Sequence, residues 1–413
     1  MVPSSELLRL GDVTSLITKG ATPTTYGHQF VDEENGDASF IGAYNCTFDG
    51  SVKLDTRKWI TKEANESLKR SKLKQGDSIL CIVGNTIGSS FLVDNSILPA
   101  NINQNVALIR PIREKLSPLY LKFAICSSFI QWQVQQEAST QAQPSLSLKQ
   151  VGDFKIFSPP LPEQQKIAKI LSTWDKAIVT TEKLIETSKQ KKKALMQQLL
   201  TGKKRLVNPD TDKVFEGEWE ESKIYQFGCV LSGGTPSTEN PSYWNGNIHW
   251  VTPTDITKLS TRTINNTART ITEQGLKNSS AKLVPAGSLL VCTRATIGEM
   301  AISLHEMCTN QGFKNLIPNK KTNIDFLYYL MCFEKHKLVS KASGSTFLEL
   351  SKKDFEHIRF VVPKVKEQQK IASVLVAADK EIEVLQAKLA HFKQEKKALM
   401  QQLLTGKRRV TLE

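Results

Sequence analysis

Side chains that could carry out covalent chemistry are dispersed along this sequence. No cysteine lies in a CxxC pair, and His305-Glu306 lacks the second histidine that a zinc protease helix carries four residues on. There is no GxGxxG motif, no phosphate-binding GxxxxGKS or GxxxxGKT motif, and no nucleophile with a base and an orienting group. We therefore expect no catalytic residue, no metal site, no disulfide framework and no cofactor in this chain.

Hydrogen-bonding side chains instead gather in glycine-flanked loops. Asn, Gln and Arg can form bidentate hydrogen bonds to base edges, and Ser and Thr can form single ones. The same residue types are common turn formers, so a structural role is the alternative for each of them. The candidate DNA-binding residues are Thr22, Thr24, Tyr26, Tyr44, Asn45, Asn85, Thr86 and Gln104 in the first half, and Thr235, Ser237, Tyr243, Trp244, Thr252, Thr254, Arg294, Thr296 and Gln311 in the second.

Composition bounds the kind of protein that carries these loops. A chain of 413 residues predicts two or three domains at roughly 100–200 residues each. The formal charge of +14 and the sequence pI of about 9.3 favour a polyanionic partner, with nucleic acid the leading candidate. There is no apolar run of about 18 residues and no basic-then-apolar leader, so we expect a cytoplasmic protein without a membrane partner.

The chain contains a tandem repeat with an offset of 204 residues. Glu163–Ala168 recurs as Glu367–Ala372, and Ala194–Lys203 recurs as Ala398–Lys407. Positions 163–205 and 367–409 align without a gap, with 25 identities in 43. An ungapped repeat of this length is typical of a continuous helix, because one inserted residue would rotate everything after it by about 100°.

The periodicity of both copies predicts a helix with a heptad seam. The seam residues alternate steps of four and three: Ile167, Leu171, Trp174, Ile178, Thr181, Ile185, Ser188, Lys192, Leu195 and Leu199, then Ile371, Leu375, Ala378, Ile382, Leu385, Leu389, Phe392, Lys396, Leu399 and Leu403. Gly202 and Gly406 stand where a C-terminal cap is expected. Because each helix connects compact segments, the two helices should pair antiparallel. Their excess of basic residues makes Lys191 and Lys192 candidate phosphate contacts.

The globular segments correspond more loosely than the helices. Three short motifs occur in the same order in both halves. Lys19–Pro23 corresponds to Ser232–Pro236, Thr86-Ile-Gly88 corresponds to Thr296-Ile-Gly298, and Asn103-Gln104 corresponds to Asn310-Gln311. Short buried strands at 79–83 and 288–292 and helices at 119–132 and 324–337 predict an α+β domain in each half. The predicted fold is thus α+β, with two domains in a pseudo-twofold arrangement separated by an antiparallel coiled coil of two long helices. The predicted boundaries are 1–158 and 219–362 for the domains, 159–205 and 363–409 for the long helices, and 206–218 for a linker.

These motifs together resemble the specificity (S) subunit of type I restriction-modification enzymes. The resemblance rests on Gly233–Pro236, Asn240–Pro253, Thr296-Ile-Gly298, Asn310–Phe313 and Glu367–Ala372, and it covers essentially the whole chain. It implies that each domain is a target-recognition domain for one half of a bipartite double-stranded DNA sequence. The first domain differs more from the sequence motifs of the family, at Lys19–Pro23 and Asn103–Asn105.

The resemblance also implies partners. Two copies of a modification subunit would bind S-adenosylmethionine and methylate adenine, and restriction or motor subunits using ATP with Mg would join through that methyltransferase core. We expect docking at the near-identical helix ends, where an apolar strip lies off the seam. The candidate docking residues are Met196, Gln197, Leu200, Met400, Gln401 and Leu404.

Other functions fit parts of the pattern. A target-recognition subunit of a type IIB-like enzyme would have the same build with a fused nuclease-methylase partner. A coiled-coil scaffold with no DNA role is an alternative from a different class, and an independent enzyme is disfavoured by the absence of catalytic motifs.

Overall fold

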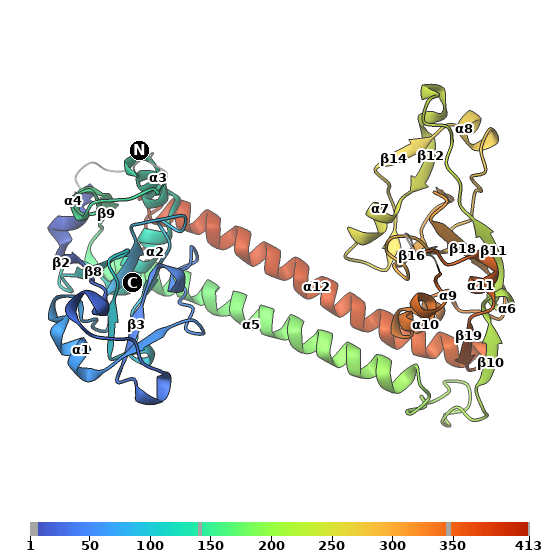
Figure 1. Ribbon diagram of the computed structural model, residues 1–413, viewed down its shortest axis with the longest axis horizontal. Helices are drawn as coiled ribbons and strands as arrows, with labels where there is room; N and C mark the ends of the chain where they lie inside the picture. Colours follow the sequence, from blue (N-terminus) through green and yellow to red (C-terminus); the bar gives the residue numbers. More distant parts are fainter. Residues whose placement is uncertain (1–6, 139–142, 344–347, 412–413) are drawn as a thin grey trace. The chain divides into compact units, whose positions relative to one another are not determined.

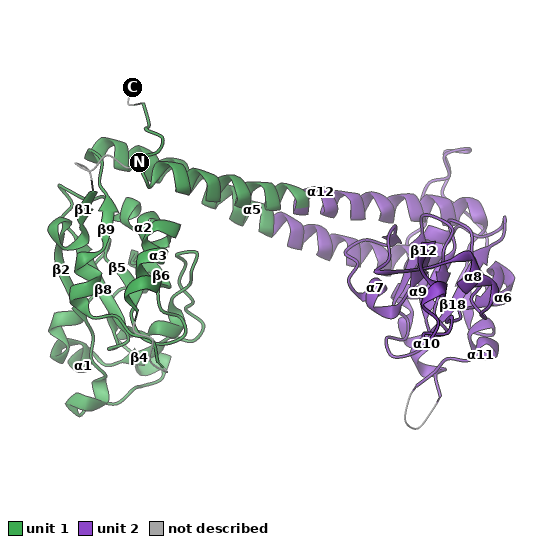
Figure 2. Ribbon diagram, turned by 90° about the horizontal axis from the view of Figure 1, so that it is seen from above, with its two compact units in different colours: residues 1–182, 387–413 green, residues 183–386 purple. Residues whose placement is uncertain are grey.

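The chain divides into two compact units, each assembled from separated stretches of sequence. The computed structural model describes residues 7–138, 143–343 and 348–411. Unit 1 takes residues 1–182 and 387–413, and unit 2 takes residues 183–386 (Figure 2). The helices and strands of both units are labelled in Figure 1. Each unit holds a mixed α and β domain together with half of each long helix. The predicted α+β class with two domains and two long helices is confirmed.

The described residues of unit 1 form three small sheets. Their strand orders are β2-β8-β5-β6, all antiparallel, β4-β3-β7, in which β3 and β7 run parallel, and the antiparallel pair β1-β9. The strands are β1 (Leu7–Arg9), β2 (Thr14–Lys19), β3 (Ala38–Ile41), β4 (Lys58–Ile60), β5 (Ser78–Cys81), β6 (Ser90–Leu92), β7 (Ala100–Ile102), β8 (Val106–Pro111) and β9 (Lys155–Phe157). The helices are α1 (Lys62–Ser67), α2 (Pro118–Cys126), α3 (Ser128–Glu137) and α4 (Leu148–Asp153).

Unit 2 repeats this plan with one more strand. Its sheets are β11-β18-β15-β16-β13, β14-β12-β17 with β12 and β17 parallel, and the pair β10-β19. The strands are β10 (Glu220–Lys223), β11 (Gly228–Ser232), β12 (Trp244–Val251), β13 (Thr263–Ile264), β14 (Arg269–Ile271), β15 (Leu289–Cys292), β16 (Met300–Ser303), β17 (Cys308–Thr309), β18 (Phe313–Pro318) and β19 (Arg359–Val362). The helices are α6 (Ile224–Phe227), α7 (Pro253–Thr257), α8 (Glu273–Lys277), α9 (Ile324–Phe333), α10 (Lys335–Ser340) and α11 (Lys352–Glu356).

Two helices of 39 residues, α5 (Leu161–Leu199) and α12 (Val365–Leu403), pair antiparallel within each unit. In unit 1, Trp174 meets Phe392 edge-on at 5.5 Å, and Lys396 forms an ion pair with Asp175. In unit 2, Lys192 forms the same ion pair with Asp379, both positions being shifted by 204 residues. Every predicted seam residue is buried or half-buried, which confirms the heptad pattern.

Both long helices end at the predicted glycines. Gly202 and Gly406 have a φ of 68°, and the amides of Lys204 and Arg408 donate to the Gln198 and Gln402 carbonyls. A left-handed glycine followed by such a hydrogen bond closes a helix end. The helix predicted over 159–205 therefore ends earlier than expected, at Leu199, and the one over 363–409 ends at Leu403.

Each of the segments 119–132 and 324–337 was predicted to form one helix, and this is wrong in one respect. The first segment is divided between α2 and α3, and the second between α9 and α10. Ser127 interrupts the first, and its hydroxyl accepts a hydrogen bond from the Ile130 amide at 3.3 Å to begin α3. Glu334 separates α9 from α10, with its own amide still bonded to the Leu330 carbonyl. A serine that caps the following helix competes with helix continuation, a local choice that apolar periodicity does not record.

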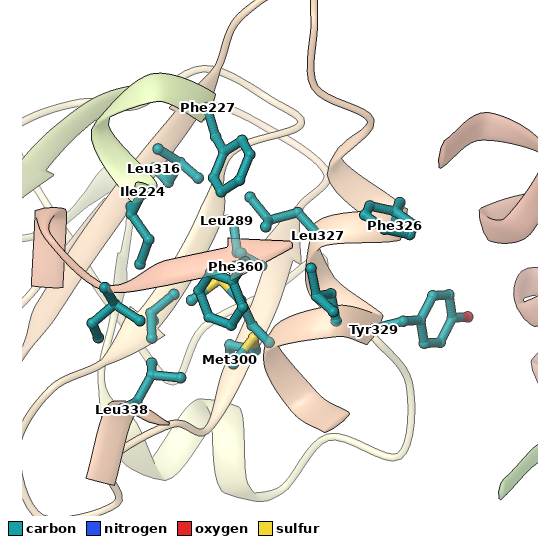
Figure 3. Packing of buried hydrophobic residues seen from close by; sticks show 14 of the residues in the cluster. Ile224, Phe227, Leu289, Met300, Leu316, Phe326, Leu327, Tyr329, Leu338 and Phe360 are labelled. Carbon is teal, nitrogen blue, oxygen red and sulfur yellow. The ribbon is translucent and has the colours of Figure 1, made fainter. Parts of the chain in front are cut away.

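The main core of unit 2 lies between its sheet, α9 and the end of α5. Figure 3 shows Ile224, Phe227, Leu289, Leu316 and Phe360 packed together, with Tyr329 at the margin and its hydroxyl directed away from the cluster. That hydroxyl donates to Asp379 on α12 at 2.5 Å. The domain is thereby fixed to the helix pair by both apolar packing and a polar contact.

Candidate nucleic-acid interface

In each domain the structure brings two of the predicted loop motifs into contact. Thr22 donates from its hydroxyl to the Gln104 side-chain oxygen at 2.5 Å, and Thr235 makes the same hydrogen bond to Gln311. The loops that follow β2 and β7, or β11 and β17, therefore share one surface. Both glutamines are exposed there.

The glycine of each motif is required by close approach of the two loops. The Gly20 amide donates to the Asn103 carbonyl at 3.2 Å, and a Cβ on Gly20 would lie 1.7 Å from the Ile102 carbonyl oxygen. In unit 2 a Cβ on Gly233 would lie 1.9 Å from the Asn310 carbonyl oxygen. Because no side chain fits in either place, only glycine allows the threonine to reach the glutamine.

The third motif, the turn after β5 or β15, adjoins the same loop. The Ile82 amide donates to the Asn105 carbonyl at 2.9 Å, and the Thr293 amide donates to the Gly312 carbonyl at 2.7 Å. The adjacent Asn85 and Thr86 are exposed. Arg294 is also exposed and forms an ion pair with Glu349 at 2.8 Å. Three sequence-distant loops thus converge in each domain.

Further predicted residues on the loops remain accessible. Tyr26 is 58% exposed and Tyr44 is 43% exposed. Burial raises the pKa of the Tyr44 hydroxyl. Thr24, Ser237 and Thr254 are exposed, whereas Tyr243 is half-buried against the tryptophan cluster of unit 2.

Four further predicted contact residues are engaged in the fold. Asn45 and Trp244 are buried, which contradicts a DNA-contact role for these two, whereas Thr252 and Thr296 are half-buried and a DNA contact by them stays a prediction. The fully buried Asn45 accepts from the Gly42 amide and donates to the Lys53 carbonyl. Trp244 is 9% exposed, and its indole N–H donates to the Ser237 carbonyl. Thr252 bonds Asp255 at 2.6 Å at the start of α7, and the Thr296 hydroxyl is buried. The side chains of Asn45, Trp244 and Thr252 thus bond to nearby turns or to a helix start, which is the alternative role of such residues.

The two adjacent lysines on α5 differ in accessibility. Lys191 is exposed. Lys192 forms an ion pair with Asp379, and its ammonium lies 5.2 Å from the centre of the Tyr329 ring. Lys191 is therefore the better placed of the two for a phosphate, because the charge of Lys192 is already paired within unit 2, and a phosphate contact by either lysine stays a prediction.

The predicted docking strip also needs correction. Leu200 is 2% exposed and belongs to the core of unit 2, and Leu404 is 3% exposed in the core of unit 1. Met196 and Met400 pack against the same cores, which leaves Gln197 and Gln401 exposed. The helix end turns at its glycine and folds these leucines against the domain, a contact that a heptad pattern of the isolated helix pair does not contain.

The repeated Glu-Gln-Gln motif joins the long helices to the domains, a role that was not predicted from the sequence although the repeat itself was a signal for it. The buried Gln164 accepts from the Ser117 amide at 2.9 Å and donates to the Pro159 carbonyl at 2.8 Å. Gln368 makes the same two contacts, both at 2.9 Å, with Asn323 and Pro363. Each glutamine thus joins a long helix to the start of the domain helix α2 or α9.

The glutamate before each of these glutamines lies near the start of one long helix and binds an arginine just after the end of the other long helix. Glu163 accepts two hydrogen bonds from Arg409 at 2.7 and 2.9 Å, and Glu367 accepts two from Arg205 at 2.5 and 2.7 Å. The hydrogen bonds from Arg409 lower the pKa of the Glu163 carboxyl. A bidentate, charge-assisted pair of this kind fixes orientation as well as charge.

Among the residues that the structure describes, no group of three or more His, Cys, Asp and Glu side chains could hold a metal ion. The cysteines among the described residues are free thiols. No helix in the described segments has the length and apolar character needed to cross a membrane.

Two α+β domains that each present three converging polar loops, with a pair of long helices, define the class of two-domain DNA-specificity proteins. The family model described as "Type I restriction modification DNA specificity domain" matches residues 4–189 and 216–394. The chain therefore belongs to the family of type I restriction-modification DNA specificity subunits.

Individual relatives agree with this membership. The type I restriction enzyme MjaIX specificity subunit of Methanocaldococcus jannaschii is 39% identical over 171 residues, covering 40% of this chain and 39% of the relative. The putative MjaX specificity subunit of the same organism is 29% identical over 74% of this chain and 72% of its own length. The HsdS subunit of Thermoanaerobacter tengcongensis shares the fold, with a TM-score of 0.55, 18% identity and 98% coverage of each chain.

Proposed function

We propose that this chain is the non-catalytic recognition subunit of a type I restriction-modification complex and reads a bipartite DNA target. The observation that carries the proposal is the same threonine–glutamine contact in both domains, Thr22 with Gln104 and Thr235 with Gln311. The residues around this contact differ between the domains, for example Asn85 in one turn and Arg294 in the other. A shared scaffold with different loop residues supports two half-sites of different sequence.

The family supports a set of partners for this subunit. Two copies of a modification subunit would supply S-adenosylmethionine and adenine methylation, and restriction or motor subunits with ATP and Mg would join through them. The internal repeat supports two equivalent docking sites, because repeated surfaces bind repeated partners. Gln197 and Gln401 are the exposed members of the predicted docking set. Such a complex acts on chromosomal DNA, so we place it in the cytoplasm.

The deciding experiment is a genome-wide map of methylated adenine in the native host with and without this gene. We expect deletion to remove one motif made of two short half-sites around a fixed unspecified spacer. If every methylation motif survives in a host that expresses the partner subunits, the recognition function is wrong and a scaffold without a DNA role replaces it. Co-purification of a fused nuclease-methylase in place of separate subunits would instead indicate a type IIB-like assembly.

A further inference from the structure

A cation held over a pair of aromatic rings occurs at the same place in both domains. In unit 1, the Lys58 ammonium lies 4.6 Å from the centre of the Phe30 ring, which packs against Phe40 at 5.3 Å. In unit 2, the Arg269 guanidinium lies 3.8 Å from the centre of the Trp244 ring, which packs edge-on against Trp250 at 5.0 Å.

Strand register shows that the two arrangements are structurally equivalent. Lys58 on β4 pairs with Phe40 on β3, and Arg269 on β14 pairs with Trp250 on β12. The strand that carries the aromatic residue, β3 or β12, also runs parallel to a third strand, which is β7 in unit 1 and β17 in unit 2. Those third strands end directly before Asn103-Gln104 and Asn310-Gln311. Each cation is thus carried by the sheet that also positions the recognition glutamine.

In unit 2 the aromatic rings also hold the recognition loop. The indole N–H of Trp250 donates to the Gly234 carbonyl at 2.9 Å, one residue before Thr235. The Arg269 guanidinium lies 5.2 Å from the centre of the Trp250 ring. The cation, the aromatic pair and the loop therefore form one connected surface.

Both cations are exposed, and neither has an acidic partner among the residues that the structure describes. The neighbouring Arg57 shows the contrast, since it lies over Trp59 but also forms an ion pair with Glu33 at 3.0 Å. A cation over an aromatic face has restricted rotamers while its polar groups stay free, so less entropy is lost when it binds an anion.

We propose that Lys58 and Arg269 are equivalent phosphate anchors, each binding the DNA backbone beside the half-site that its own domain reads. The two residues share a positive charge but not the planar fork that recognises guanine, so their common ligand is a phosphate and not a particular base. The proposal rests on the proposed function and extends it, because phosphate contacts fix the register in which loop residues meet bases.

The test measures binding of the full-length chain to two fluorescent duplexes between about 50 and 200 mM salt. One duplex carries the motif found by methylation mapping, and the other has the same composition in shuffled order. Replacing Lys58 or Arg269 by Gln should lower the slope of log affinity against log salt by about 0.9 on both duplexes. Over that range the wild type should then lose about 3.5-fold more affinity than either variant.

Matched variants separate this role from others. Arg269→Lys should keep the wild-type slope, and Arg57→Gln should keep it too, although it removes an equal charge from a neighbouring position. An unchanged slope in either Lys58→Gln or Arg269→Gln would overturn the proposal that the two are equivalent anchors. A loss confined to the motif duplex would also overturn it, because that result would indicate base reading. A wild type that does not distinguish the duplexes refutes the proposed function, while the slopes on the shuffled duplex still decide the anchors.

Discussion

At the scale of single residues, the proposed base recognition rests on side chains whose hydrogen-bond donors are left free by the fold. Gln104 and Gln311 each accept a hydrogen bond from a threonine through the side-chain oxygen. Neither amide NH2 group has a hydrogen-bond partner among the described residues. An oriented, unpaired NH2 donor suits an acceptor on a base edge, and the threonine fixes which way it points.

Replacing Gln311 by Ala should therefore relax the second half-site alone, by on the order of 1–3 kcal/mol at one base position. The matched change Gln104→Ala should relax the first half-site alone. The readout is the methylated motif recovered from a library randomised in both half-sites. Uniform weakening of all sequences by either variant would assign that glutamine to the backbone.

Two adjacent lysines on α5 offer a second comparison at this scale. Lys191→Gln should lower the salt slope of DNA binding by about 0.9 if the exposed lysine contacts a phosphate. Lys192→Gln should leave the slope unchanged, because Lys192 already pairs with Asp379. It should lower the free energy of unfolding by on the order of 1–3 kcal/mol, since Asp379 loses that partner. Urea denaturation beside the binding titration distinguishes the two effects, and a slope change in Lys192→Gln would refute its interior role.

At the scale of elements, the long helices are anchors for the domains as well as partners for each other. Gln164 and Gln368 bond the starts of α2 and α9, while Leu200 and Leu404 enter the domain cores just after the helices end. A helix end that contributes to a domain core resists rotation about its own axis. The repeated ends are therefore explained at least as well by packing as by partner docking.

Leu404→Ala should lower the free energy of unfolding by roughly 2–5 kcal/mol, as expected for a truncated buried leucine. Gln401→Ala, three residues earlier and exposed, should leave stability unchanged. Thermal and urea unfolding check both. The same Gln401 variant tests docking, because loss of a co-purifying modification subunit without loss of stability would place the contact there, and retained binding would move it elsewhere.

At the scale of the whole molecule, unit 1 is discontinuous in sequence, because residues 387–413 belong to it together with residues 1–182. Arg409 reaches Glu163 across 246 positions, and its hydrogen bonds lower the pKa of that carboxyl. A carboxyl with a lowered pKa in the folded state stabilises the fold above its unfolded pKa of about 4.3, and this contribution is lost as pH falls through the folded value.

Arg409→Gln should consequently destabilise unit 1 at neutral pH, and the deficit relative to wild type should shrink as the pH falls below about 4. Lys407→Gln removes the same charge two residues earlier and should leave the pH profile unaltered. Urea unfolding midpoints measured from neutral to acid pH provide the test. A deficit that is constant with pH would show that the pair contributes packing and not charge.

The sequence by itself determined the repeat, the seam of both long helices, their glycine ends and the family. A helix records its contacts every three to four residues, so Ile167, Leu171 and the positions after them can be recognised without knowing the rest of the fold. The matched loop motifs likewise indicated which segments of the two domains correspond, whereas the contact of Gln104 with Thr22 came from the structure.

Only the tertiary structure decided which candidates face outward and which distant residues act together. The burial of Asn45, Trp244 and Leu200 depends on turns and domain contacts that leave no periodic signal. Lys58 and Arg269 become equivalent through strand pairing, although Phe30 and Phe40 differ from Trp244 and Trp250 in residue type and spacing. Sheet contacts join residues far apart in the chain, so similar geometry arises from sequences with no visible match, whereas a helix must repeat its pattern locally.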